Sequence, residues 1–251
     1  RRIERQLHRQ KQYRQRALLK AMVGAQEQER ERVAEELHDG LGPTLSVLRM
    51  NLSMLENNLK GEMNARAREL MEVCQKLVNE TTNDVRGISS NLMPSLLRDF
   101  GLRKALYRLI DRLNDTQDTF VDCVVEDNVP VLAEEAELGI YRMVQELVNN
   151  ALKYSQADTI TVRLWAAQDA LHLQVTDDGV GFDLKATRKR MRQDDGGMGL
   201  QNVTTRARLL RGQLQINTEP GHGVEVLIVF PLAHVTSAQE TDSSRNQGHS
   251  P

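Results

Sequence analysis

The stretch VTDDGVGFD, residues 175–183, decides the fold of the second half of this chain. The alternating residues before it predict a strand that ends in Asp177. Gly179 and Gly181 then predict a tight turn with exposed backbone. A carboxylate at the end of a strand can accept a hydrogen bond from an exocyclic amino group.

A basic, glycine-rich loop at 179–198 follows and leads into GGMGL, residues 196–200. Gly197 and Gly199 come directly before a predicted helix, and a helix N-terminus reached through glycines is a ready anion site. Either glycine pair alone is typical of an ordinary turn. The order of strand, turn, basic loop and helix is far more specific.

The surrounding sequence mixes two periodicities, which indicate helices and strands of an α+β fold. We expect strands at 119–127, 159–167, 170–177, 213–219 and 223–231, and helices at 102–114, 133–153 and 199–211. Together they predict an α/β sandwich. From residue 233 the sequence is polar without an apolar period, so 233–251 is expected to be a disordered tail.

The predicted helix at 133–153 contains QELVNNALKY, residues 145–154. Glu146 and Asn150 are four residues apart and share one face, and Lys153 follows one turn later. A carboxylate, a carboxamide and a Lys on one stripe suit a hydrated Mg²⁺ and the phosphates that it bridges. A solvated helix face would carry the same residue types.

The N-terminal third predicts a helical hairpin. Apolar residues recur at helical spacing through residues 1–60 and again through 65–90, with a turn around 60–64. Such narrow apolar stripes cannot be buried within one hairpin. We therefore expect two chains to form a dimeric four-helix bundle.

The first of these helices carries ELHDGLGPTLS, residues 36–46. If the Asp39 carboxylate held the Nδ1–H of His38, Nε2 would be left as a nucleophile. A solvated helix residue is the plain alternative for an isolated His. The helix breakers Gly40, Gly42 and Pro43 would clear space beside His38, and the proline should kink the helix there.

Composition gives the general class. The net charge is −2, hydrophobic residues make up 39%, and no apolar run approaches the ~20 residues of a membrane span. The first residue is Arg rather than Met, so we expect a fragment. Residues 1–20 hold eight Lys or Arg and one Glu. A cytoplasmic segment next to a membrane span explains this better than a nucleic-acid-binding arm.

The second half resembles the ATP-binding fold shared by gyrase, heat-shock protein ninety, histidine kinases and MutL. The resemblance implies that Asn150 coordinates Mg²⁺, that Asp177 binds the adenine amino group, and that Glu146 matches an acid that activates water in the ATPase members. It further implies that Gly179 and Gly181 shape the nucleotide pocket, that Gly197 and Gly199 flank the phosphates, and that the basic loop is a lid.

The run EQERERVAEELHDGLG, residues 27–42, resembles the phosphoacceptor helix of sensor histidine kinases of the nitrate-sensor class. The resemblance implies ATP-dependent phosphorylation of His38 and transfer to an Asp of a response regulator. Three positions depart from that class: Pro43 replaces a Gln that orients a hydrolytic water, Tyr154 replaces a His, and Val224 replaces a Thr.

The sequence thus predicts the cytoplasmic kinase core of a membrane-anchored sensor histidine kinase, a homodimer that uses ATP and Mg²⁺ and does not bind nucleic acid directly. The expected organisation is a signalling coiled coil (1–24), a dimerisation and phosphotransfer domain (25–93), a linker (94–101), a catalytic ATP-binding domain (102–232) and the tail. An ATP-binding scaffold and a gyrase-like or MutL-like ATPase are the alternatives.

Overall fold

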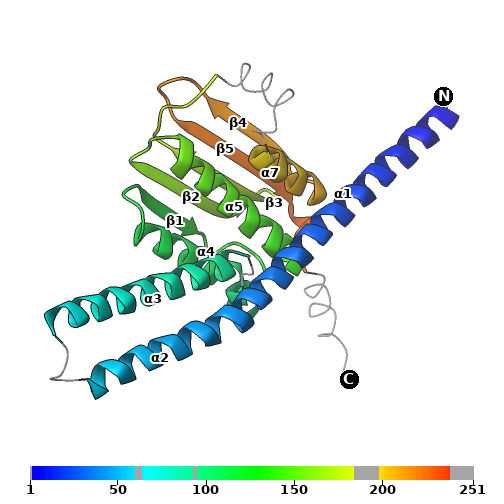
Figure 1. Cartoon of the computed structure of the whole chain (residues 1–251). Helices are drawn as coiled ribbons and strands as arrows, with labels where there is room; N and C mark the ends of the chain where they lie inside the picture. Colours follow the sequence, from blue (N-terminus) through cyan, green and yellow to red (C-terminus); the bar gives the residue numbers. More distant parts are fainter. Residues whose placement is uncertain (1, 60–63, 93–94, 184–197, 238–251) are drawn as a thin grey trace, which may run out of the picture. The chain divides into compact units, whose positions relative to one another are not determined.

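The computed structural model describes residues 2–59, 64–92, 95–183 and 198–237. The chain divides into two compact units, of which one is Lys20–Ser95 and the other is Leu96–Pro251 together with Arg1–Leu19. In its described part the first unit is helical, whereas the second combines helices with a sheet (Figure 1). The predicted α+β fold, long helices followed by a sheet domain, is confirmed.

The helical unit is a hairpin with one irregular turn. It contains the part of α1 (Arg2–Glu36) from Lys20 onward, a π-helical turn η1 (Leu37–Leu41), α2 (Gly42–Asn58) and α3 (Ala65–Leu92). Helices α2 and α3 lie side by side (Figure 1). Polar contacts join the two arms: the Ser89 hydroxyl donates to the Ala34 carbonyl oxygen at 3.1 Å, and the Gln75 amide donates to the Glu56 carboxylate at 2.9 Å.

Large apolar side chains remain exposed along this hairpin. Leu41, Val47, Leu48, Met50, Met54, Leu55, Leu70, Val73, Leu77 and Ile88 are each 45–56% exposed. None of the residues of α2 is buried. Contiguous exposed apolar surface of this kind marks an interaction site. One hairpin therefore leaves its apolar stripes uncovered, as the narrow periodicity predicted.

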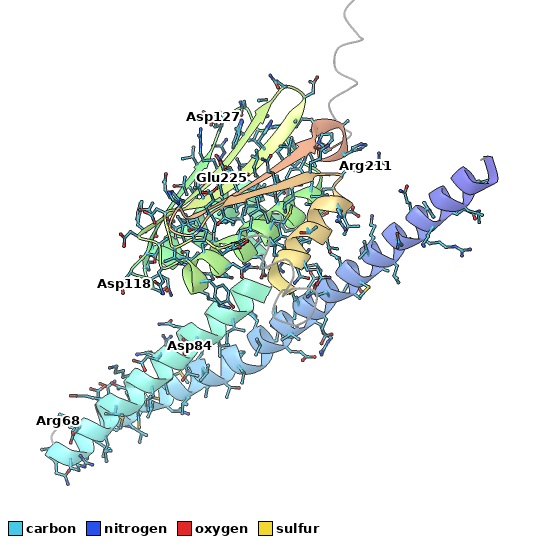
Figure 2. The ribbon with its side chains drawn as sticks, turned by 90° about the horizontal axis from the view of Figure 1, so that it is seen from above. Arg68, Asp84, Asp118, Asp127, Arg211 and Glu225 are labelled. Atoms are coloured by element: carbon cyan, nitrogen blue, oxygen red, sulfur yellow. The ribbon has the colours of Figure 1, made fainter. Side chains whose placement is uncertain are left out.

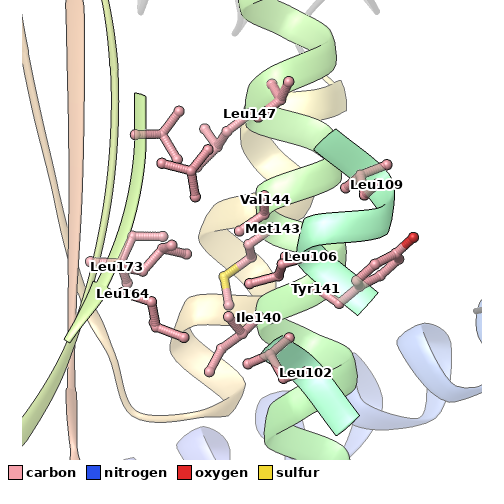
Figure 3. Packing of buried hydrophobic residues seen from close by; sticks show 14 of the residues in the cluster. Leu102, Leu106, Leu109, Ile140, Tyr141, Met143, Val144, Leu147, Leu164 and Leu173 are labelled. Atoms are coloured by element: carbon pink, nitrogen blue, oxygen red, sulfur yellow. The ribbon is translucent and has the colours of Figure 1, made fainter. Parts of the chain in front are cut away.

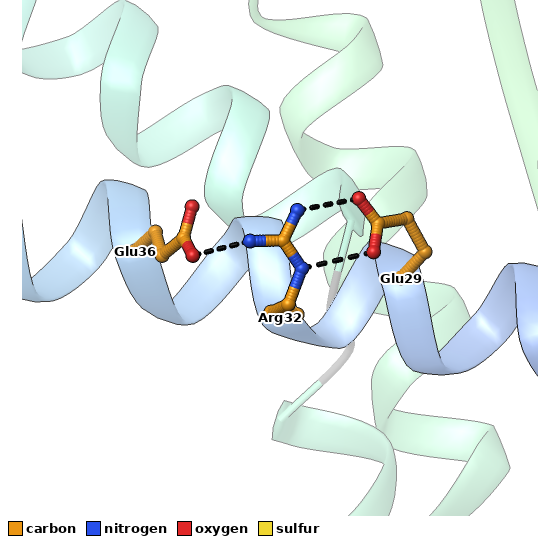
Figure 4. A network of polar contacts seen from close by, with 3 residues as sticks. All are labelled: Glu29, Arg32 and Glu36. Atoms are coloured by element: carbon orange, nitrogen blue, oxygen red, sulfur yellow. Dashed lines mark hydrogen bonds and ion pairs between the residues drawn. The ribbon is translucent and has the colours of Figure 1, made fainter.

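Charged residues keep the rest of the helical surface solvated. Arg32 donates from Nε and an Nη to Glu29, at 2.9 and 2.5 Å, and also contacts the Glu36 carboxylate (Figure 4). These i,i+3 and i,i+4 pairs follow from helical spacing. Arg68 and Asp84 are exposed on α3 (Figure 2). Within the described ranges, none of the helices has the length and hydropathy needed to cross a bilayer.

The second unit is built on a five-stranded sheet in the order β1-β2-β3-β5-β4. Its strands are β1 (Phe120–Val125), β2 (Thr159–Ala167), β3 (Ala170–Asp177), β4 (Gln213–Thr218) and β5 (Val224–Pro231). Strands β1 and β2 are parallel and are joined by a helical crossover, whereas every other pair is antiparallel. The two-residue turn Gln168–Asp169, with φ of 51° and 59°, closes the predicted β2–β3 hairpin.

Three helices cover one face of this sheet: α4 (Ser95–Asn114), α5 (Glu134–Tyr154) and α7 (Met198–Leu209) (Figure 1). Alternate strand residues such as Leu164 and Leu173 point into the core and are fully buried. They meet Ile140, Met143 and Val144 of α5 in an aliphatic core (Figure 3). On the opposite face, Trp165 and His172 stack with ring centroids 5.0 Å apart.

The segment expected to be a linker, 94–101, is largely helical where it is described. Helix α4 begins at Ser95 and is interrupted at Gly101, whose φ of 77° and ψ of 172° are not helical. The Glu137 carboxylate accepts the Leu102 N–H at 3.4 Å, directly after the break. Gly101 is thus a breaker as predicted, but the residues before it form a helical turn.

The tail expected to be disordered from residue 233 begins later. A short 3₁₀ helix spans Leu232–His234, Val235 is fully buried, and the Ala133 N–H donates to the Val235 carbonyl at 2.8 Å. Thr236 forms a β-bridge with Leu132. The prediction was wrong for 233–237, because one buried valine fixes a short segment that has no apolar period. Residues 238–251 lie outside the described ranges.

Candidate functional site

Asp177 occupies the end of β3, where the sequence placed it, and it is only 8% exposed. Its carboxylate accepts the Gly179 N–H at 3.0 Å, and the Val224 N–H is near enough to affect its pKa. Burial raises the pKa of this carboxyl, and the two N–H donors lower it in part. The carboxylate is therefore held in one orientation and retains acceptor capacity for a ligand amino group.

Gly179 and Gly181 shape the loop after Asp177 by close packing. A Cβ on Gly179 would lie 2.2 Å from the carbonyl oxygen of Ser155, which also accepts the Val180 N–H at 2.7 Å. Gly181 has a φ of 57°, and a Cβ there would lie 2.1 Å from the Glu219 carbonyl oxygen. Both glycines are required by neighbouring backbone, which fixes the loop against the C-terminal end of α5.

A second group of predicted residues meets between α5 and α7. An added Cβ on Gly199, in the first turn of α7, would lie 2.2 Å from Glu146 Oε1 and 3.0 Å from Asn150 Nδ2. The helix N-terminus therefore lies directly against the carboxylate and the carboxamide of α5. We call Glu146, Asn150 and Gly199 the α5–α7 cluster. Its oxygen donors are those that Mg²⁺ prefers, and the helix N-terminus favours an anion beside them.

The structure says less about the other residues that were predicted near the α5–α7 cluster. Lys153 lies on α5 one turn after Asn150 and is exposed, as is Tyr154 at 72%. Gly197 and most of the basic loop lie outside the described ranges. In the described part of the chain, no three His, Cys, Asp or Glu side chains form a metal-binding group. A metal at the α5–α7 cluster would thus depend on a carboxamide and on phosphate oxygens.

Sequence reasoning missed two residues that organise this site. Ser155 is the C-cap residue of α5. Its hydroxyl accepts the Ala157 N–H at 3.1 Å, and its carbonyl oxygen accepts the Val180 N–H. Thr218, at the end of β4, bonds to both loops next to Asp177. A Ser whose hydroxyl can accept the N–H of the second residue after it is a recognisable turn signal. Thr218 could not have been found, because its role depends on strand register.

The helical unit holds the other predicted group. His38 Nδ1 lies 2.9 Å from Asp39 Oδ1, and each side chain is 80% exposed. A carboxylate can only accept, so this contact assigns the ring proton to Nδ1. Nε2 is then left with a lone pair in an open position. Adjacent residues reach each other here because the helix is irregular at this point.

The irregularity is a π-helical turn, Leu37–Leu41, in which the Gly42 N–H donates to the Leu37 carbonyl. Pro43 falls in the first turn of α2, where a missing N–H is tolerated. The Thr44 hydroxyl donates to the Gly40 carbonyl oxygen at 2.9 Å. The disturbance expected from Pro43 therefore takes the form of a wider turn, a feature found frequently at functional sites.

These two groups are an exposed His–Asp pair on a helical hairpin and a buried Asp near a helix N-terminus in an α/β sandwich, and both are features expected of a nucleotide-binding phosphotransfer protein. A family model described as histidine kinase-, DNA gyrase B- and HSP90-like ATPase matches residues 135–234, and a model described as histidine kinase matches residues 29–97. The chain belongs to the histidine kinases and carries their core domains, including the ATP-binding one.

Relatives with known names agree with this assignment. The oxygen sensor histidine kinase NreB of Staphylococcus carnosus is 31% identical over 90% of this chain and 63% of its own length. An uncharacterized sensor-like histidine kinase of Chloroflexus aurantiacus is 31% identical over 84% of this chain and 36% of its own length. The histidine-protein kinase/phosphatase DegS of Bacillus subtilis is 31% identical over 84% and 55%. The chain thus spans between 36% and 63% of these relatives.

Proposed function

We propose that this chain is the kinase core of a sensor histidine kinase, which phosphorylates His38 from ATP and passes the phosphoryl group to an Asp of a response regulator. The observation that carries the proposal is the contact of 2.9 Å between His38 Nδ1 and Asp39. In the neutral ring it leaves the Nε2 lone pair exposed, which is what an attacking nitrogen requires. The family assignment supports the same activity.

The reaction follows from these atoms. The Nε2 lone pair attacks the γ-phosphorus of ATP, the bond from that phosphorus to the β–γ bridging oxygen breaks, and ADP leaves. Positive charge develops on the imidazole ring, and the Asp39 carboxylate at Nδ1–H offsets it. Adenine is held by its amino group at Asp177, and the phosphates are held near the N-terminus of α7.

Mg²⁺ is part of this proposal. The α5–α7 cluster fits it, because Asn150 and Glu146 supply oxygens beside an anion-binding helix N-terminus. When bound, Mg²⁺ neutralises phosphate charge. Asn150 would be its ligand from the protein, Lys153 would approach the phosphates, and Glu146 would act on a proton or water near them.

We further propose that two chains pair through the exposed apolar stripes of the hairpin to form a four-helix bundle, and that the receiver domain docks near His38. The proposed domain organisation is a signalling coiled coil at 1–24, a dimerisation and phosphotransfer domain at 25–93, a linker at 94–101 and an ATP-binding domain at 102–237. The membrane anchor is proposed to lie upstream. The basic segment at 1–20 supports the last point.

The test is incubation with γ-labelled ATP and Mg²⁺. Acid-labile, base-stable label on the chain that disappears in His38→Gln, and persists in the control His234→Gln, is expected. Asp39→Asn should slow labelling, because the proton on Nδ1 is no longer held by a charge. Phosphate release that survives loss of His38 would favour a gyrase-like ATPase, and binding without labelling would favour a scaffold.

A further inference from the structure

Two loops flank Asp177, and the Thr218 hydroxyl bonds to both of them. The first loop, 178–182, follows β3, and the second, 219–223, connects β4 to β5. Thr218 Oγ1 accepts the Phe182 N–H of the first loop at 3.0 Å and donates to the Gly223 carbonyl of the second at 2.9 Å. A third link, from the Gly221 N–H to the Val180 carbonyl at 2.6 Å, closes the same junction.

Strand register places this hydroxyl in line with the carboxylate. Asp177 is paired with Val224, and Val224 is paired with Thr218, so the three residues form one row across β3, β5 and β4. Directly paired residues of antiparallel strands share a face of the sheet. Val224 has no side-chain hydrogen-bonding group, and the Asp177 carboxylate instead accepts the Gly179 N–H of the first loop at 3.0 Å. The position of that N–H depends on the first loop, which Thr218 holds through the Phe182 N–H.

The space around Gly223 leaves little freedom. Its φ is 69°, and an added Cβ would lie 2.0 Å from the Asp177 carbonyl oxygen. The second loop is thus pressed against the backbone of Asp177, and the bond from Thr218 to the Gly223 carbonyl holds it there. Without the hydroxyl, the Gly223 carbonyl and the Phe182 N–H lose a partner, and of the three links described the Gly221–Val180 bond is left to hold the loops together.

We propose that Thr218 is a positioning residue for nucleotide recognition: its hydroxyl clamps the two loops so that the Gly179 N–H of the first loop orients the Asp177 carboxylate toward the adenine amino group. The inference rests on the proposed ATP site. Adenine presents an amino donor where guanine presents a carbonyl acceptor, so an oriented carboxylate selects ATP over GTP. Thr218 therefore acts on base selectivity without contacting the base.

The test compares ATP and GTP binding to the full chain by titration calorimetry with Mg²⁺ present. Thr218→Val keeps the shape and removes the hydroxyl, and we expect about tenfold weaker ATP binding, the factor that one hydrogen bond to a buried partner supplies. GTP binding should change much less, so selectivity falls. Thr218→Ser should restore both values, because it returns the hydroxyl.

Thr236→Val is the matched control, since Thr236 also donates to a backbone carbonyl, that of Leu232 at 3.0 Å, but beyond the other end of β5. It should leave both affinities unchanged. Equal losses of ATP and GTP binding in Thr218→Val, or no loss, would overturn the inference. If the unmodified chain does not bind ATP at all, the proposed ATP site itself is refuted, which is a separate result.

Discussion

Gly199→Ala should leave the fold intact and strongly weaken nucleotide binding. The added Cβ would lie 2.2 Å from Glu146 Oε1 and 3.0–3.3 Å from the carboxamide of Asn150. The first distance is more than about 1 Å short of an ordinary contact, so the flexible Glu146 side chain must turn away. Ala also favours a helix over Gly by up to ~1 kcal/mol. We therefore expect an unfolding temperature equal to that of the parent or up to about 4 °C higher.

The same substitution should lower the affinity for MgATP, although it does not lower the stability of the protein without ligand. A lost ligand or charged hydrogen bond of about 1.5–3 kcal/mol weakens binding about 10–150-fold. At a ligand concentration of 100 Kd, the parent gains about 2.7 kcal/mol, or roughly 5–10 °C. A hundredfold weaker variant gains about 0.4 kcal/mol at the same concentration. Thermal melts with and without MgATP would show this difference.

Gly139→Ala is the control for this experiment. Gly139 also lies between α5 and α7, where an added Cβ would meet Leu210 at 3.0 Å, far along α5 from Asn150. It should lower the unfolding temperature slightly and leave the MgATP shift in place. A full MgATP shift in Gly199→Ala would refute the α5–α7 cluster as the phosphate and metal site.

Three further variants test other parts of the molecule. Leu48→Glu should turn a dimer into a single-chain species of 28.5 kDa in light scattering, because a buried carboxylate costs several kcal/mol. Arg49→Glu, on an adjacent side of α2, should leave the dimer intact. If the unmodified protein is itself a single chain in solution, the four-helix bundle is contradicted. Asp177→Asn should lose its preference for ATP over GTP. Because the pKa of Asp177 is raised in the folded state, its ionisation destabilises the unmodified protein as the pH rises above about 3.9. The stability of Asp177→Asn relative to the unmodified protein should therefore increase with pH in thermal melts from pH 3 to 8. A stability difference that stays constant over this range would exclude this cause. Finally, the unmodified chain should dephosphorylate a response regulator poorly, because Pro43 has no polar side-chain group and the Thr44 hydroxyl already donates to the Gly40 carbonyl. Pro43→Gln should raise the dephosphorylation rate, and Pro43→Ala should not. Strong phosphatase activity of the unmodified chain in the presence of ADP would refute this prediction.

Regular periodicity made much of the fold predictable. The bounds of β2 and β3 agree with the predicted 159–167 and 170–177, because both strands alternate strictly around a two-residue turn. The tail at 233–237 was missed, since its place is fixed by the single buried residue Val235. The π-helical turn was also missed, because a bond from residue i to i+5 leaves no periodic signal over one turn.

The sequence predicted which residues belong to the candidate site better than it predicted the contacts that explain why each residue is there. Glu146 and Asn150 share a face because they are four apart, and the sequence shows this directly. That Gly199 meets them depends on how α7 packs on α5, which no local pattern contains. Gly179 was expected to shape a nucleotide pocket, whereas its nearest neighbour is the backbone of Ser155.

The wide turn beside His38 also bears on chain length. Closing the Leu37 carbonyl to the Gly42 N–H encloses one residue more than an α-helical turn does. The helix has in effect absorbed an insertion: the wider turn takes up one residue, so the faces before and after His38 keep the alignment of an unbroken α-helix that is one residue shorter. Gly40 has nothing within 4 Å of where a Cβ would lie. Deleting it would let an unbroken α-helix form with those faces still aligned, whereas a deletion within α2 would put Leu48 and its neighbours out of register with α3.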